Sequence, residues 1–207
     1  MAGPLRIGVL ASHEGTILQA ILDACAAGEI PVRVVAVVSN NSDSGALRRA
    51  RAVSARAIHL SAKTHPEPGA LDLAIAKALL DEQVEVVMLA GYMKKLGAAL
   101  LGQYRGRILN THPALLPKFG GQGMYGVRVH EAVLRAGETE SGPSVHLVDA
   151  EYDTGRVLAQ AQVPVLEGDT VESLAARVQE RERRLVVAVL GQIAHGELEL
   201  EGLGARD

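Results

Sequence analysis

Short apolar runs alternate with helical patterns along the first half of this chain, and this alternation limits the fold more than any other feature. The runs are rich in Val, Ile and Leu, which is typical of strands buried on both faces of a parallel sheet. They cover Leu5–Leu10, Val32–Val38, Ala57–Leu60 and Val84–Ala90. Between them, the spacing of apolar residues predicts helices that begin at Thr16 or span Gly45–Val53 and Gly69–Asp81. The pattern predicts an α/β fold: a Rossmann-like, mostly parallel twisted sheet with helices on both faces.

The second half continues with less regular elements. We expect a helix near Leu96–Tyr104, a strand at Arg107–Leu109, a loop rich in Pro and Gly over 113–126, a helix at Val127–Ala136, and strands at Ser144–Val148 and Val157–Val165. A long helix begins at Asp169, which we expect to be the N-cap, with Glu172 as the carboxylate three residues later. No repeat or domain-scale linker interrupts the chain, so we predict one domain over residues 1–207.

Composition excludes several classes of protein. Four Tyr, one Phe and no Trp cannot form the aromatic surface on which single-stranded nucleic acid stacks, and the net charge of −3 includes no long basic block. The single cysteine, Cys25, cannot form an internal disulfide. No apolar segment is long enough for a membrane span, and the apolar N-terminal stretch is too short for a signal peptide. We therefore expect a cytoplasmic protein that handles small molecules and has no nucleic-acid or membrane partner.

The first strand leads into the turn Ser12-His13-Glu14-Gly15-Thr16. In open α/β sheets, ligands bind beyond the carboxyl ends of the strands, and the N-terminus of a helix offers free N–H groups to a phosphate. Gly15 permits close approach of the backbone, and Thr16 can add a hydroxyl. By position alone, a phosphate site and an ordinary strand-to-helix loop are equally well supported.

A second glycine pattern, Gly121-x-Gly123-x-x-Gly126, matches the letters of a dinucleotide-binding motif. That motif must follow the first strand of a strand–helix–strand unit, with an acidic residue about 20 positions later. Here it follows Leu115–Phe119, which we interpret as loop. We therefore predict a glycine-rich loop and no nicotinamide site.

The segment Asn110-Thr111-His112-Pro113 carries the strongest local signal for chemistry. Residues two apart in extended backbone point to the same side, so the Asn110 amide and the His112 imidazole share one space and Thr111 faces away. Pro113 favours extended backbone at His112. Such a pair can stabilise an oxyanion and move a proton, whereas the alternative is a structural histidine in a turn. A nearby carboxylate would raise the pKa of His112, and Asp153 is the candidate.

Glu182 interrupts the apolar stripe of the last predicted helix. A carboxylate on an inward face is either paired or part of a site. Because Arg181, Arg183 and Arg184 are adjacent, the sequence alone favours a salt bridge. The remaining histidines show no metal-ligand spacing, and His146, between apolar neighbours in Ser144–Val148, is interpreted as a hydrogen-bonded strand residue; we predict no metal.

Together these residues resemble a known family. VVMLAGYMKKL at 86–96, RILNTHPALLPKF at 107–119, the SVH strand at 144–146, DTGRVL at 153–158 and RVQERE at 177–182 are similar to phosphoribosylglycinamide formyltransferases, folate-dependent enzymes of purine biosynthesis. The resemblance runs from Leu5 to about His195. It implies the formyltransferase fold, with antiparallel strands in the C-terminal part. It also implies formyl transfer from 10-formyltetrahydrofolate, a co-substrate, to the amine of N1-(5-phospho-D-ribosyl)glycinamide.

The resemblance also implies roles for individual residues. Residues 1–105 would bind the nucleotide phosphate, and residues 106–207 would supply catalysis and folate binding. The catalytic trio would be Asn110, His112 and Asp153. The glycinamide ribonucleotide would be held by His13, Glu14, Gly15, Thr16, Ile17, Pro113, Gln179 and Glu182. The folate would be held by Leu89, Met93, Lys94, Lys95, Leu96, Asn110, Val148, Asp149 and Asp153.

One stretch departs from the family pattern. Where members commonly have S-G-x-G-S-N in the first turn, this chain has S-H-E-G-T-I, and Glu14 near a phosphate is unfavourable unless it points away or His13 is protonated. Three alternatives stay open: a formyltetrahydrofolate deformylase, a sugar-nucleotide formyltransferase, and a noncatalytic nucleotide-binding module. The chain is compatible with a monomer or a homodimer.

Overall fold

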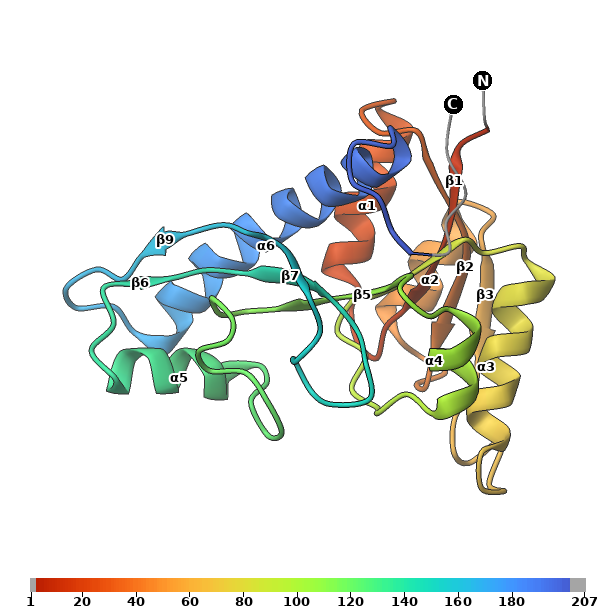
Figure 1. Ribbon diagram of the computed structural model, residues 1–207, viewed down its shortest axis with the longest axis horizontal. Helices are drawn as coiled ribbons and strands as arrows, with labels where there is room; N and C mark the ends of the chain where they lie inside the picture. The colour runs from red at the N-terminus through yellow and green to blue at the C-terminus, as the bar shows by residue number, and fades with distance from the viewer. Residues whose placement is uncertain (1–2, 202–207) are drawn as a thin grey trace.

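The computed structural model describes residues 3–201, and in these the chain forms one large sheet covered by helices (Figure 1). The strands are β1 (Leu5–Leu10), β2 (Val32–Ser39), β3 (Arg56–His59), β4 (Val86–Leu89), β5 (Ile108–His112), β6 (Glu140–Ser141), β7 (Ser144–Leu147), β8 (Val157–Gln160) and β9 (Val163–Pro164). The helices are α1 (Thr16–Ala26), α2 (Gly45–Ala52), α3 (Ala70–Asp81), α4 (Ala98–Gln103), α5 (Val127–Arg135) and α6 (Val171–Ala194). The ends of the predicted domain, residues 1–2 and 202–207, lie outside the described residues.

The seven-stranded sheet has the order β3-β2-β1-β4-β5-β7-β8. The first five strands in this order are parallel, whereas β7 pairs antiparallel with both β5 and β8. This arrangement confirms the predicted fold class, including the antiparallel strands toward the C-terminus. Since β1 and β4 are neighbours in the middle of the sheet, the loops that follow β1, β4 and β5 meet at one edge.

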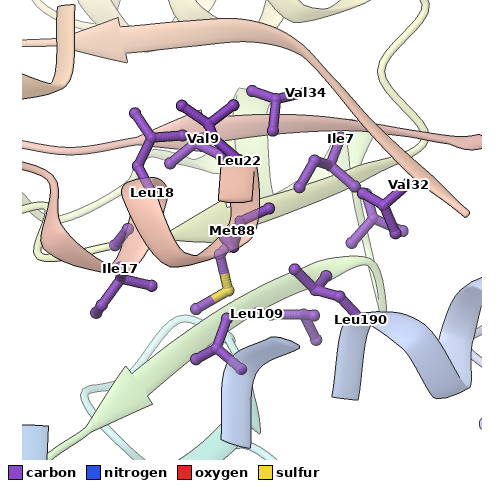
Figure 2. Packing of buried hydrophobic residues seen from close by; sticks show 14 of the residues in the cluster. Ile7, Val9, Ile17, Leu18, Leu22, Val32, Val34, Met88, Leu109 and Leu190 are labelled. Atoms are coloured by element: carbon purple, nitrogen blue, oxygen red, sulfur yellow. The ribbon is translucent and has the colours of Figure 1, made fainter. Parts of the chain in front are cut away.

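Two apolar layers hold the helices against the sheet. On one face, β1 contributes Ile7 and Val9 to a cluster with α1 and α6, which Figure 2 shows from close by. On the other face, Leu10 and the alternate residues of β2 and β4 pack against α3 and α4. The runs of β1, β2 and β4 are therefore largely buried on both faces of the sheet, as their aliphatic composition predicts, whereas β3, at the edge of the sheet, is only partly buried.

Three details of the sequence prediction are wrong. Strand β5 does not end at Leu109 but continues to His112, because it also pairs with β7 through Thr111 and His112. The predicted strand Val157–Val165 is two strands, and the second of these, β9, pairs with β6, for which no strand was predicted. The long helix is capped by Thr170, whose side chain accepts from the Ser173 N–H, and not by Asp169 with Glu172.

Asp169 instead contacts the first turn of α6 from outside. Its Oδ1 accepts from the Ser173 hydroxyl, and both of its carboxylate oxygens accept from the Arg177 guanidinium. These hydrogen bonds lower the pKa of Asp169 far below its usual value. Asp169 and Arg177 thus fix the start of α6, the helix that carries Gln179 and Glu182.

Candidate active site

Strand β5 presents its last three side chains alternately to the two sides of the sheet. The Asn110 amide and the His112 imidazole point to the same side, as predicted, where both lie within reach of the segment around Asp153. Thr111 points the other way and donates its hydroxyl to Glu182 on α6. The alternation of side chains along one strand thereby separates two polar clusters whose residues are adjacent in the sequence.

Asp153 connects two histidines. Its Oδ2 lies 3.4 Å from His112 Nδ1, and its Oδ1 lies 3.5 Å from His146 Nε2. The carboxylate follows β7 in a turn where the backbone of Asp153 has a φ of 58°, a conformation that Asp tolerates better than most residues. The predicted trio of Asn110, His112 and Asp153 is therefore assembled at the edge where β4 and β5 end.

His146 is a site residue that the sequence analysis missed. It is buried in β7 directly opposite Asn110, and its Nε2 lies 3.1 Å from the Asn110 amide nitrogen. Its Nδ1 lies 2.8 Å from the carbonyl oxygen of Leu147, which can only accept, so Nδ1 is the donor in this bond. The sequence predicts that His146 is hydrogen-bonded within a strand. Its partners follow only from the register between β5 and β7.

The glycine-rich loop after β5 lies against His112 and Asp153 of the trio. The carbonyl oxygen of Phe119 accepts from His112 Nε2 at 2.7 Å, and the N–H of Gly121 donates to Asp153 Oδ2 at 2.9 Å. Gly121, Gly123 and Gly126 all have positive φ, so their conformations favour glycine at the positions that the sequence pattern marks. The pattern thus belongs to a loop that contacts the trio.

Burial and charge act in opposite directions on His112. Burial lowers the pKa of the imidazole more than Asp153 and the Phe119 carbonyl raise it, so the pKa lies below its usual value of 6.5. Asp153 raises the pKa of His112, as expected, but burial outweighs this effect, so the net change is downward. In Asp153, the hydrogen bonds and the two histidines outweigh burial and lower the pKa, so the carboxylate stays ionised.

A narrow cavity of about 90 Å³ adjoins the trio. It brings together most of the residues that the resemblance assigns to the folate: Leu89, Lys94, Lys95, Leu96, Asn110, Val148, Asp149 and Asp153. Tyr92, His146 and the loop 150–152 complete the lining. Met93 is outside it, with an exposed side chain and its N–H donated to the Ser12 hydroxyl. The Lys95 ammonium lies over the Tyr152 ring, 5.3 Å from its centre, and so links the two walls.

On the opposite side of β5, Glu182 is buried on α6. Its Oε1 accepts from the Thr111 hydroxyl at 3.0 Å, and burial raises the pKa of the carboxyl group. No ion pair of Glu182 occurs in residues 3–201, so the salt bridge that the neighbouring arginines suggest is wrong: those arginines share the helix but not its inward face. Gln179 is exposed one turn before Glu182, and Pro113 is half-buried after β5.

The loop 13–17 is held by α2. Gly15, with a φ of 72°, precedes α1, and no side chain caps the helix. His13, Glu14 and Thr16 are exposed, whereas Ile17 packs into the core. Glu14 lies 3.4 Å from the Arg48 guanidinium, so its carboxylate is paired with a cation on α2. In residues 3–201, no hydrogen bond or ion pair joins this loop to Gln179 or Glu182.

Within residues 3–201, no group of three or more His, Cys, Asp or Glu side chains lies together as metal ligands would. No helix in this part of the chain is both long and apolar enough to cross a membrane.

The fold and site define an α/β protein with a histidine–carboxylate–amide cluster at the carboxyl ends of its strands. Residues 5–190 match the sequence model described as formyl transferase. The chain belongs to this family of formyl-transferring enzymes.

Individual proteins with names in this family are similar to the chain in sequence and in structure. A phosphoribosylglycinamide formyltransferase from Mycobacterium tuberculosis is 43% identical over 197 residues, 94% of this chain and 88% of that protein. A chloroplastic one from Arabidopsis thaliana is 41% identical over 189 residues, 91% of this chain, but the match spans only 65% of that protein's length. The crystal structure of glycinamide ribonucleotide transformylase 1 from Symbiobacterium toebii superposes with a TM-score of 0.89 at 41% identity, covering 98% of this chain and 93% of that chain.

Proposed function

We propose that this protein transfers the formyl group of 10-formyltetrahydrofolate to the amine of N1-(5-phospho-D-ribosyl)glycinamide, a step of purine biosynthesis. One observation supports this most directly: Asn110, His112 and Asp153, drawn from two distant parts of the chain, lie together beside the cavity between segments 92–96 and 148–153. The M. tuberculosis relative is named for this activity.

The proposal divides the substrates between two sides of β5. The cavity fits the ring of a folate in chemical character, because aliphatic walls of Leu89, Leu96 and Val148 surround a few polar groups. On the other side, Thr111, Glu182 and the uncapped start of α1 would receive the ribonucleotide, with the phosphate at the helix N-terminus. In this scheme residues 1–105 supply the phosphate site and residues 106–207 supply the folate site and the catalytic groups.

The folate supplies the reactive formyl carbon, and the protein's own groups would manage charge and protons around it. As the substrate amine adds to that carbon, negative charge develops on the formyl oxygen. Asn110 Nδ2 and His112 Nε2 would donate to this oxygen, His112 exchanging the Phe119 carbonyl for it. Asp153, 3.4 Å from Nδ1, would stabilise positive charge on the ring. The bond between the formyl carbon and N10 then breaks. The amine loses one proton, N10 of the folate gains one, and no covalent enzyme intermediate forms.

The proposal predicts the behaviour of Asp153→Asn. Asn also tolerates positive φ and keeps one oxygen acceptor for Gly121, so the fold should persist, but the negative charge beside His112 is removed. We expect kcat to fall by about 10²- to 10⁴-fold, the usual contribution of a general acid–base group. Steady-state kinetics with both substrates and the melting temperature measure the two effects. Asp81→Asn, exposed at the end of α3 and outside the cavity, is the control and should keep kcat; near-normal turnover of Asp153→Asn would refute the role.

One assay separates the alternatives. Purified protein is mixed with 10-formyltetrahydrofolate, with and without glycinamide ribonucleotide, and released folate and formylated product are followed. We expect both to appear in equal amounts and only when the amine is present. Folate release without amine would indicate a deformylase. No release at all would indicate a noncatalytic binding module or a formyltransferase for a different amine, and repeating the assay with an amino-sugar nucleotide separates these two. The proposed reaction requires no metal, and we expect it to take place in the cytoplasm.

A further inference from the structure

The loop 13–15 rests directly on the first turn of α2. The Ala46 N–H donates to the carbonyl oxygen of His13 at 3.2 Å. A Cβ added at Gly45 would lie 2.7 Å from the Glu14 carbonyl oxygen and 2.8 Å from its Cα, distances that real Cβ atoms do not adopt. A Cβ at Gly15 would lie 3.0 Å from the Cα of Ala46. The backbones of the two segments are therefore in direct contact, and this contact requires glycine at position 45 of α2.

Arg49, one turn further along α2, connects this loop to α1. Its Nε donates to the carbonyl oxygen of Glu14 at 2.9 Å, and its Nη1 donates to the Gln19 side chain. The backbone N–H of Gln19 in turn bonds the carbonyl oxygen of Gly15 at 2.9 Å, closing the first turn of α1. A planar guanidinium can serve two acceptors at fixed angles, which an ammonium cannot do. Arg49 thus holds the loop and the helix start in one arrangement.

Arg48 has a different part in the same cluster. It lies 3.4 Å from the Glu14 carboxylate, but both side chains are largely exposed, so the ion pair contributes little stability. It keeps the carboxylate of Glu14 beside a cation on α2. The charge that makes Glu14 unfavourable near a phosphate is therefore balanced within the cluster.

We propose that Arg49 is a positioning residue for the substrate phosphate: it does not touch the phosphate, but fixes loop 13–15 and the first turn of α1 in the geometry that receives it. This inference rests on the proposed function, which places the phosphate at the start of α1. It adds α2, a helix outside the predicted site, to the elements that determine affinity for the ribonucleotide.

The kinetic test compares Arg49→Ala, Arg49→Lys and Gly45→Ala. We expect Arg49→Ala to raise KM for glycinamide ribonucleotide about tenfold, the factor that corresponds to losing one hydrogen bond from a charged donor. KM for the folate and kcat should stay within about twofold. Arg49→Lys keeps the positive charge but not the planar guanidinium with its two donor groups, so it should give an intermediate KM. Gly45→Ala should raise the same KM, because its Cβ displaces Glu14. Arg51→Ala, exposed on the same helix, is the matched control and should match the unaltered protein.

Amide hydrogen exchange of the free protein tests the positioning without relying on the reaction. Arg49→Ala should accelerate exchange in peptides that cover residues 12–20 and leave those of β4 and β5 unchanged, whereas Arg51→Ala should change neither. Unaltered exchange in residues 12–20, or a KM effect shared equally by both substrates, would overturn the proposal. If the unaltered protein does not use glycinamide ribonucleotide, the proposed function fails, and the exchange experiment still decides whether Arg49 holds the loop.

Discussion

At the scale of single residues, the alternation of side chains along an extended segment determines which side chains of β5 join the polar cluster around Asp153. Asn110 and His112 share a side and Thr111 faces away because a strand has a period of two. The same reasoning cannot identify His146, whose place opposite Asn110 depends on strand register. Nor can it fix the sign of the pKa change at His112, because burial, which dominates, is set by the whole fold.

Glu182 gives a prediction at this scale. A buried carboxylate with a raised pKa is costly in the folded state, so a site role, more than stability, explains its presence. Glu182→Gln keeps the shape and an acceptor for Thr111 but removes the charge. We expect an unchanged or higher melting temperature and a KM for glycinamide ribonucleotide raised about tenfold, the cost of losing a charged hydrogen-bond partner. Thermal unfolding and steady-state kinetics measure this. Glu180→Gln, exposed on α6, should alter neither; a lower melting temperature with unchanged KM would make Glu182 structural.

At the scale of elements, β1, β2, β4, α1 and α3 are predictable because each has a strong apolar pattern, whereas α2 and β3 have only a few apolar positions. The predictions fail where pairing partners are remote. β6 and β9 have two residues each and exist only because they pair with each other. The cap of α6 moves by one residue because Asp169 bonds Arg177 instead. The glycine-rich loop is recognisable as a loop, but its contacts with His112 and Asp153 follow from its folding back over β5.

That loop allows a matched comparison of two glycines. Gly121 and Gly123 both have positive φ, and an added Cβ would meet nothing within 4 Å at either, so alanine introduces similar backbone strain. Only Gly121 donates to Asp153. We expect Gly121→Ala to lower kcat about tenfold, because backbone strain at this position displaces the N–H that donates to Asp153, and Gly123→Ala to lower it much less. Kinetics and amide exchange of residues 119–126 test this, and equal effects of the two variants would show that loop strain alone matters.

At the scale of the whole molecule, the pH dependence of stability should reflect buried histidines. His130 on α5 is buried, and its Nδ1 has no hydrogen-bond partner among residues 3–201. Burial together with the charge of His112 lowers the pKa of His130. His112 has a lowered pKa for the reason given above. Asp153 and Asp169 also have lowered pKa values, but theirs start from 3.8. The two kinds of group therefore act in separate pH ranges.

The sign of each effect follows from proton linkage. Below pH 6.5 the unfolded chain protonates these histidines while the folded state does not, so stability falls as the pH decreases from 6.5 toward the folded pKa values, by at most about 1.4 kcal/mol per pH unit for each histidine. The carboxylates add a second loss only below about pH 3.8. We therefore expect the melting temperature to fall between pH 7 and 5. His130→Leu should make that fall shallower, because one of the two groups no longer titrates, whereas His59→Gln, at an exposed position, should leave it unchanged. Thermal unfolding at half-unit pH steps measures the slopes, and identical slopes for His130→Leu and the unaltered protein would mean that His130 titrates alike in both states.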